Sequence, residues 1–152
     1  MHSLSLTASL VLALFCTNAS AYCFAEAGQR YGVDPRLLQA MAKVESSGKW
    51  NAVNRGHLNK TNSVDIGLMQ INSRWLGRKP FITLGYTQAH LFDPCTNVMV
   101  GAWVLADNIK TYGNNWNAVG AYNASCTQLN KTDCLKARNS YAWKVYKAMT
   151  SS

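Results

Sequence analysis

The chain has 152 residues, a formal net charge of +8 and 48% hydrophobic residues, a length that suits a single domain. Apart from the N-terminal segment, no stretch approaches the ~18 consecutive apolar residues of a membrane-spanning helix. These properties exclude an integral membrane protein with several spans. The positive charge favours a polyanionic or carboxylate-rich partner.

The first 21 residues differ in composition from the rest of the chain. They contain no Lys, Arg, Asp or Glu, and Leu4 to Cys16 form an almost purely apolar run. The small residues Ala19 and Ala21 then match an A-x-A cleavage site. We therefore predict a signal peptide over residues 1–21 and one folded domain over 22–152, with a retained N-terminal anchor as the alternative. An exported protein rarely meets nucleic acid, so we expect neither a nucleic-acid partner nor a membrane contact after cleavage.

Four cysteines follow the signal peptide: Cys23, Cys95, Cys126 and Cys134. An even number in an exported chain predicts two disulfides, for which the sequence permits three connectivities. We favour Cys126–Cys134, a short local loop, and Cys23–Cys95, which would tie the N-terminus to the core. Loop entropy gives ~2.5 and ~4 kcal/mol for them. Zinc is the alternative, but no C-x-x-C pair exists and the histidines stand alone, so we expect no metal.

Proline and glycine mark the first two predicted helices. Asp34-Pro35 combines an N-cap with proline at the first helical position, and Gly48 lies where that helix would end. Asp93-Pro94 repeats the start signal for a helix that ends at Gly113. Two more helices are expected, a short one from Trp116 to Tyr122 and a last one that follows Asp133.

The segment 49–66 lies between the first two helices and is polar and rich in turn-forming Asn, Ser and Gly. We expect a small β-hairpin or loop lobe here, and the segment Asp65 to Asn72 leads out of it. The fold class is therefore α+β, predominantly α. A cleft is plausible between the helical body and the polar lobe.

Glu45 is a candidate catalytic acid. It follows Met41 by four residues and Leu38 by seven, which places its carboxylate beside the apolar stripe near the C-terminal end of the helix. Burial and the negative end of the helix dipole would both raise its pKa. A carboxylic acid that stays protonated near neutral pH can donate a proton to a leaving group. The alternative is an edge glutamate with its carboxylate in water.

Three motifs occur in a fixed order: Glu45-Ser46-Ser47-Gly48, Gly67-Leu68-Met69-Gln70-Ile71-Asn72 and Gly120-Ala121-Tyr122-Asn123-Ala124. Together they resemble the soluble lytic transglycosylases of the lysozyme-like superfamily. The likeness covers nearly all of 23–146 and is strongest to the small exported members that accompany type III and type IV secretion systems, conjugation or pili. It implies a lysozyme-like fold, a periplasmic monomer that acts on peptidoglycan without a cofactor, and a link to such a machine.

The resemblance also implies roles for single residues. Glu45 would be the catalytic acid and base, and Ser46 would help to orient it. The residues expected to bind the glycan or lie near the acid are Met69, Gln70, Asn72, Tyr122, Asn123 and, as the family's late tyrosine, Tyr141. The implied reaction cleaves the bond between N-acetylmuramic acid and N-acetylglucosamine and closes a 1,6-anhydro ring.

The sequence departs from the family pattern at two places. Ser125 and Cys126 follow Ala124 where the family usually has glycine, so this wall of the cleft would differ. Asp65 lies where many of these enzymes have no acid. Its surroundings resemble the strand that carries the second catalytic carboxylate of animal-type lysozymes, which are a standard example of a two-carboxylate site. We therefore count Asp65 as a second catalytic candidate and a turn-forming residue as its alternative.

Two other functions remain open from the sequence. A lysozyme-type hydrolase would use Glu45 and Asp65 and end the reaction with water. A murein-binding assembly factor of a secretion or pilus machine would have little activity, although the intact motif around Glu45 argues against that.

Overall fold

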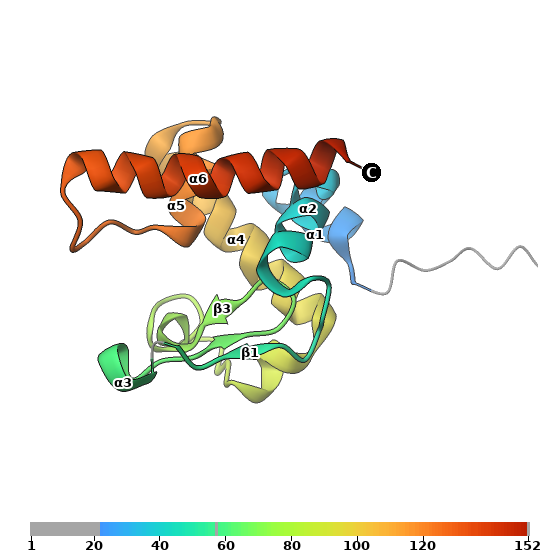
Figure 1. The fold of residues 1–152 in the computed structure, drawn as a ribbon. Helices are drawn as coiled ribbons and strands as arrows, with labels where there is room; N and C mark the ends of the chain where they lie inside the picture. Colours follow the sequence, from blue (N-terminus) through green and yellow to red (C-terminus); the bar gives the residue numbers. More distant parts are fainter. Residues whose placement is uncertain (1–21, 57, 152) are drawn as a thin grey trace, which may run out of the picture.

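Five helices form the body of the protein in a computed structural model, which describes residues 22–56 and 58–151 (Figure 1). They are α1 (Phe24–Tyr31), α2 (Pro35–Ser46), α4 (Pro94–Tyr112), α5 (Trp116–Asn123) and α6 (Lys131–Thr150). The long helix α6 lies across the other helices and packs on α2 and α5. The predicted signal peptide falls outside the described residues. Within them, no helix has both the length and the apolar character needed to span a bilayer.

The polar segment forms a lobe beside the helical body (Figure 1). Its strands β1 (Val53–Asn54), β2 (Asp65–Ile66) and β3 (Ile71–Asn72) make an antiparallel sheet in the order β1-β2-β3. The short helix α3 (Leu58–Thr61) precedes β2, and the 3-10 helices η1 (Ser73–Gly77) and η2 (Ala89–Phe92) lead back to the body. The predicted α+β class, predominantly α, is confirmed, and the segment Asp65 to Asn72 belongs to the sheet rather than leading out of it.

Local capping explains the bounds of α2 and α4. The Asp34 carboxylate accepts a hydrogen bond from the Arg36 backbone N–H at 2.8 Å, and Asp93 accepts one from Thr96 N–H at 2.7 Å. Each cap is followed by proline, as predicted. Helix α2 ends at Ser46, because Ser47 already adopts a left-handed conformation with φ of 56°.

Helix α6 begins earlier than the sequence suggested. Asn130 is its N-cap and accepts a hydrogen bond from Asp133 N–H at 2.9 Å, while the Asn130 side-chain amide donates to the Asp133 carboxylate at 2.7 Å. Asp133 therefore lies in the first turn and stabilises it from within. The prediction that the helix follows Asp133 was wrong because both residues are good caps, and only the backbone shows which one fills that position.

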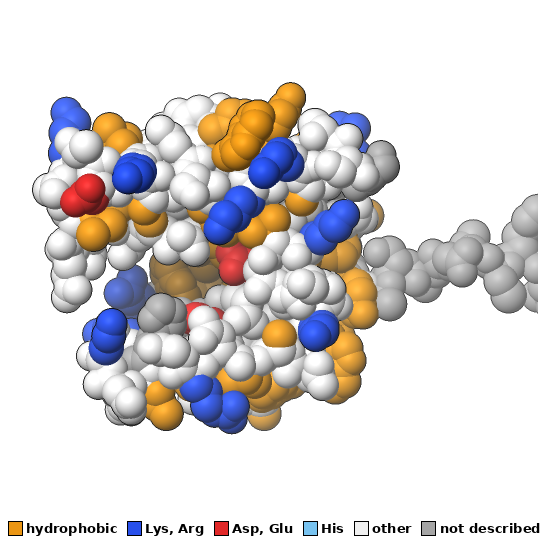
Figure 2. Space-filling view, viewed as in Figure 1, with side chains coloured by type: hydrophobic (Ala, Val, Ile, Leu, Met, Phe, Trp, Pro, Cys, Tyr) orange, Lys and Arg blue, Asp and Glu red, His pale blue; other side chains and the backbone are white. Residues whose placement is uncertain are grey.

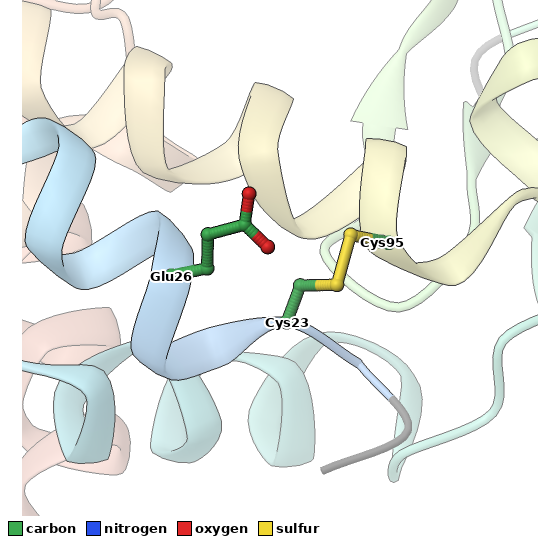
Figure 3. A group of neighbouring side chains, drawn as sticks. All are labelled: Cys23, Glu26 and Cys95. Atoms are coloured by element: carbon green, nitrogen blue, oxygen red, sulfur yellow. A yellow bond between two sulfur atoms is a disulfide. The ribbon is translucent and has the colours of Figure 1, made fainter. Parts of the chain in front are cut away.

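Both favoured disulfides are present. Cys126 is bonded to Cys134, and Cys23 is bonded to Cys95 across 72 positions in the sequence. The second bond joins the residue before α1 to the first turn of α4 (Figure 3). It thereby fixes α1, a helix that was not predicted from the sequence, against α4.

A buried amide joins the lobe to the body. Asn97 of α4 is fully buried, and its Nδ2 donates to the Ile66 and Leu91 carbonyls at 2.9 and 2.8 Å. Its Oδ1 accepts a hydrogen bond from Met69 N–H at 2.8 Å. These bonds satisfy backbone groups of Ile66 and Met69 at the turn between β2 and β3 and of Leu91 in η2, where a buried unpaired group would cost about 1–3 kcal/mol. They hold β2 and β3 in a fixed position relative to the helices.

Candidate active site

Glu45 lies in the last turn of α2, where α6 packs against that helix. Its side chain is half-buried, and the Tyr141 hydroxyl of α6 donates a hydrogen bond to Glu45 Oε1 at 2.5 Å. Tyr141 is itself buried, with 5% of its surface exposed. The hydrogen bond fixes one carboxylate oxygen and joins residues 96 positions apart in the sequence.

Burial raises the pKa of Glu45 from 4.5 to about 7. The hydrogen bond from Tyr141 acts in the opposite direction, and the negative charge of Asp65 adds to the increase in that pKa. Near neutral pH, Glu45 can therefore both hold a proton and release one. This is the property expected of a group that serves first as general acid and then as general base.

Asp65 approaches the same region from β2 of the lobe. Its two carboxylate oxygens accept hydrogen bonds from side-chain amides, Asn72 Nδ2 at 2.7 Å and Asn54 Nδ2 at 3.3 Å. All three residues come from the small sheet, in which Asp65 is paired with both Asn54 and Asn72. The sheet thus orients a second carboxylate whose charge is felt at Glu45.

Tyr122 of α5 lies close to both acids. Its pKa is raised well above the usual value, because partial burial of the side chain and the charges of Glu45 and Asp65 oppose ionisation. Its hydroxyl donates to the Met69 carbonyl at 2.9 Å. Tyr122 therefore stays a neutral donor and links α5 to the turn of the lobe.

A cavity of about 340 Å³ opens beside Glu45. It is lined by Val44, Glu45, Asn123, Ala137, Ser140, Tyr141 and Lys144. Figure 2 shows a hollow between the α6 side of the molecule and the lobe, with acidic side chains at its edges and apolar groups inside it. Asn123 is exposed on the cavity wall, as a residue that contacts a bound sugar must be.

The remaining predicted residues, Ser46, Met69 and Gln70, are buried or partly buried. Ser46 donates its hydroxyl to the Ala42 carbonyl at 3.1 Å, within its own helix. The Met69 side chain is fully buried. Gln70 has a left-handed backbone with φ of 47°, and its Nε2 donates to the Gly67 carbonyl at 2.9 Å. The structure thus gives Ser46, Met69 and Gln70 contacts within the protein.

Two residues near the acids were not predicted from the sequence. Asn54 holds Asp65, and Lys144 lines the cavity beside Glu45. Lys144 could have been found from helical spacing, because it follows Tyr141 by three residues and shares its face. Asn54 had no such signal, since its pairing with Asp65 depends on the register of two very short strands.

One group of side chains in the described residues has the composition of a metal site, Cys23, Glu26 and Cys95 (Figure 3). Both of its sulfur atoms are joined in the disulfide, so neither is a thiolate that could bind a metal. The exposed Glu26 carboxylate is left as the single charged ligand. The group therefore does not fit a structural or catalytic metal.

Comparison with known proteins places this geometry in a family. The chain is 39% identical to "Invasion protein IagB" of Salmonella typhimurium over 136 residues, which are 90% of this chain and 82% of that protein. It is 38% identical to "Protein IpgF" of Shigella flexneri over 128 residues, 84% of this chain and 78% of that protein. It is 35% identical to "Peptidoglycan-binding-like protein" of Escherichia coli O157:H7 over 131 residues, 84% of this chain and 76% of that protein.

The family model described as "Transglycosylase SLT domain" matches residues 22–143, which include all three sequence motifs and both acids. The predicted membership of the lysozyme-like superfamily is thereby confirmed. With its predominantly helical α+β fold and its half-buried acid, the chain belongs to the transglycosylase SLT domain family.

Proposed function

We propose that this protein is a lytic transglycosylase that cleaves the β-1,4 bond between N-acetylmuramic acid and N-acetylglucosamine in peptidoglycan. The observation that carries the proposal is Glu45, an acid with a pKa raised to about 7 that faces a cavity of about 340 Å³. Membership of the SLT family supports a reaction of this class.

The first step is proton donation. Tyr141 occupies Oε1 of Glu45, which leaves Oε2 as the oxygen that delivers a proton to the glycosidic oxygen. The bond from C1 of the muramyl residue to that oxygen breaks, and N-acetylglucosamine leaves with a free 4-hydroxyl. The substrate's own N-acetyl group stabilises the positive charge at C1, and the negative charge of Asp65 lowers the energy of that charge further.

The second step returns the proton. Glu45 is now a carboxylate and takes the proton from the muramyl C6 hydroxyl, whose oxygen bonds to C1. The product is a 1,6-anhydromuramyl end, and Glu45 recovers its proton. The cycle consumes no water, and none of its steps calls for a metal or cofactor.

A hydrolytic outcome is the second candidate, and Asp65 is the observation that favours it. Its carboxylate is oriented by Asn54 and Asn72 and raises the pKa of Glu45, as a second carboxylate opposite the acid would. A retaining hydrolase uses such a group as nucleophile. Water would then end the reaction and leave a reducing muramic acid.

The experiment combines activity with product analysis. Glu45→Gln keeps the shape of the side chain but removes its proton, and we expect a loss of ~10⁴ in the rate of murein clearing, near the upper end for a general acid. Mass analysis of the wild-type products should show mainly 1,6-anhydromuropeptides. Products with reducing muramic acid would establish the hydrolase instead. A Glu45→Gln variant that clears murein as fast as the wild type would refute both mechanisms.

We further propose that the mature protein works in the periplasm and opens murein locally for a secretion, conjugation or pilus machine. The A-x-A site, the two disulfides and the likeness to a protein named for invasion support this placement. Fractionation should find the processed chain, starting at Tyr22, with the periplasmic proteins. Recovery of the full-length chain from the cytoplasm would contradict the proposal.

A further inference from the structure

Lys144 is a basic residue on the wall of the cavity that contains Glu45. It projects from α6 one turn after Tyr141, so the helix that orients the acid also carries a cation into the same cavity. Its side chain is exposed. The reaction proposed above assigns no role to this charge.

The Lys144 ammonium has no partner within residues 22–56 and 58–151. The ion pair found there joins Arg36 to Asp34, and the Lys144 side chain takes part in no hydrogen bond or ring contact in this range. A lysine paired with Glu45 would lower the pKa of that acid. The pKa of Glu45 is raised instead, by burial and by the charge of Asp65, and the group that lowers it is the Tyr141 hydroxyl rather than Lys144. Lys144 is therefore free to meet an anion that enters the cavity.

The charge balance of the cavity indicates which anion that is. Glu45 and Lys144 are the acidic and basic residues of its lining, so the cavity is positive whenever Glu45 is protonated. Lys and Arg side chains also gather on the face above the hollow (Figure 2). A glycan built only of N-acetylglucosamine is neutral and gains nothing from this charge. A muramyl residue carries carboxylates, on its peptide stem or on its lactyl group once the stem is removed.

We propose that Lys144 binds a carboxylate of the muramyl residue and so makes the site prefer murein strands to neutral glycans of the same backbone. The inference rests on the proposed function and adds a determinant of specificity to it. Lys144 is a substrate-binding residue in this account, and it takes no part in the proton transfers.

Direct binding tests this without turnover. The dissociation constants of Glu45→Gln and of Glu45→Gln with Lys144→Met are compared for soluble peptide-bearing strands, amidase-treated strands and chitooligosaccharides. We expect binding of the muramyl ligands to weaken about fivefold, as for a partly exposed ion pair, and that of chitooligosaccharides to stay the same. A loss confined to peptide-bearing strands assigns the stem carboxylate, a loss confined to amidase-treated strands assigns the lactyl carboxylate, and a loss on both shows that Lys144 binds either one.

Two further variants serve as controls. Lys147→Met removes a charge from the same helix outside the cavity, where Lys147 lies 6.0 Å from the ring centre of Trp143, and should leave binding unchanged. Lys144→Arg should restore most of the affinity, and the difference should shrink at ~1 M salt, where the Debye length is about 3 Å. An equal loss on chitooligosaccharides, or no loss on either muramyl ligand, would overturn the proposal.

Cleavage by the otherwise wild-type enzyme separates this inference from the proposed function. If the function is right, Lys144→Met should raise KM for murein about fivefold and leave kcat unchanged, because the ion pair forms equally in the ground and transition states. If the wild type binds murein through Lys144 but does not cleave it, the proposed function fails and the role of Lys144 stands.

Discussion

The raised pKa of Glu45 has a consequence for stability that can be measured without substrate. An unperturbed glutamate has a pKa of 4.5, and Glu45 has a pKa of about 7 in the folded protein. Below pH ~4.5 the group is protonated in both the folded and the unfolded chain, so it does not favour unfolding. Between these values the unfolded chain loses the proton while the folded chain keeps it. The free energy of unfolding therefore falls as the pH rises through this window.

The size of this loss follows from the shift in pKa. At 1.36 kcal/mol per unit, a shift from 4.5 to about 7 is worth ~3 kcal/mol above the folded-state pKa. Glu45→Gln cannot ionise, and its amide oxygen can still accept the hydrogen bond from Tyr141. We expect this variant to be as stable as the wild type at about pH 4 and ~3 kcal/mol more stable at about pH 8, or ~10 °C in Tm.

Urea unfolding of both proteins at these two pH values is the assay. Asp107→Asn is the control, because it removes an exposed carboxylate from within α4, and the effect of Glu45→Gln should change more between the two pH values than the effect of this variant. A Glu45→Gln variant whose stability relative to wild type does not change with pH would refute the reasoning, since Glu45 would then ionise alike in both states.

Four more outcomes are expected. Tyr141→Phe removes the hydrogen bond that lowers the pKa of Glu45, so the alkaline limb of the pH profile of murein clearing should move to higher pH. An unchanged limb would show that Tyr141 does not act on the pKa of Glu45. Asp65→Asn removes a charge that raises the pKa of Glu45, so the alkaline limb should move to lower pH, and the loss of rate should be smaller than for Glu45→Gln. An unchanged activity and pH profile would make Asp65 a turn residue. Gly67→Ala should cost about 3 kcal/mol in urea unfolding, because Gly67 has φ of 78° and an added Cβ would lie 2.2 Å from Asn97 Nδ2, and a near-neutral effect would contradict that packing. Thiol counting on the exported protein should find no free thiol, and reduction should lower the Tm; two or more reactive thiols would contradict the bonds seen here.

Features that depend on residues close together in the chain could be predicted from the sequence. Asp34-Pro35 and Asp93-Pro94 start helices because the aspartate carboxylate accepts a hydrogen bond from a free backbone N–H of the first turn. The proline that follows has no N–H that would need a partner. The position of Glu45 beside an apolar stripe likewise predicted its partial burial, since helical spacing alone places it there. Where two local signals competed, as at Asn130 and Asp133, the same reasoning chose the wrong one.

Contacts between distant elements were decided only by the tertiary structure. Tyr141 reaches Glu45 across 96 positions, and the Asn54 and Asn72 amides reach Asp65 through a sheet whose strands have two residues each. Such short strands have too few alternating polar and apolar residues to reveal their register. A motif also shows neither which side of a residue is buried nor what packs against it. The sequence could thus propose Glu45 as the acid, but the hydrogen bond to its Oε1, which leaves Oε2 free, exists only because α6 packs across α2.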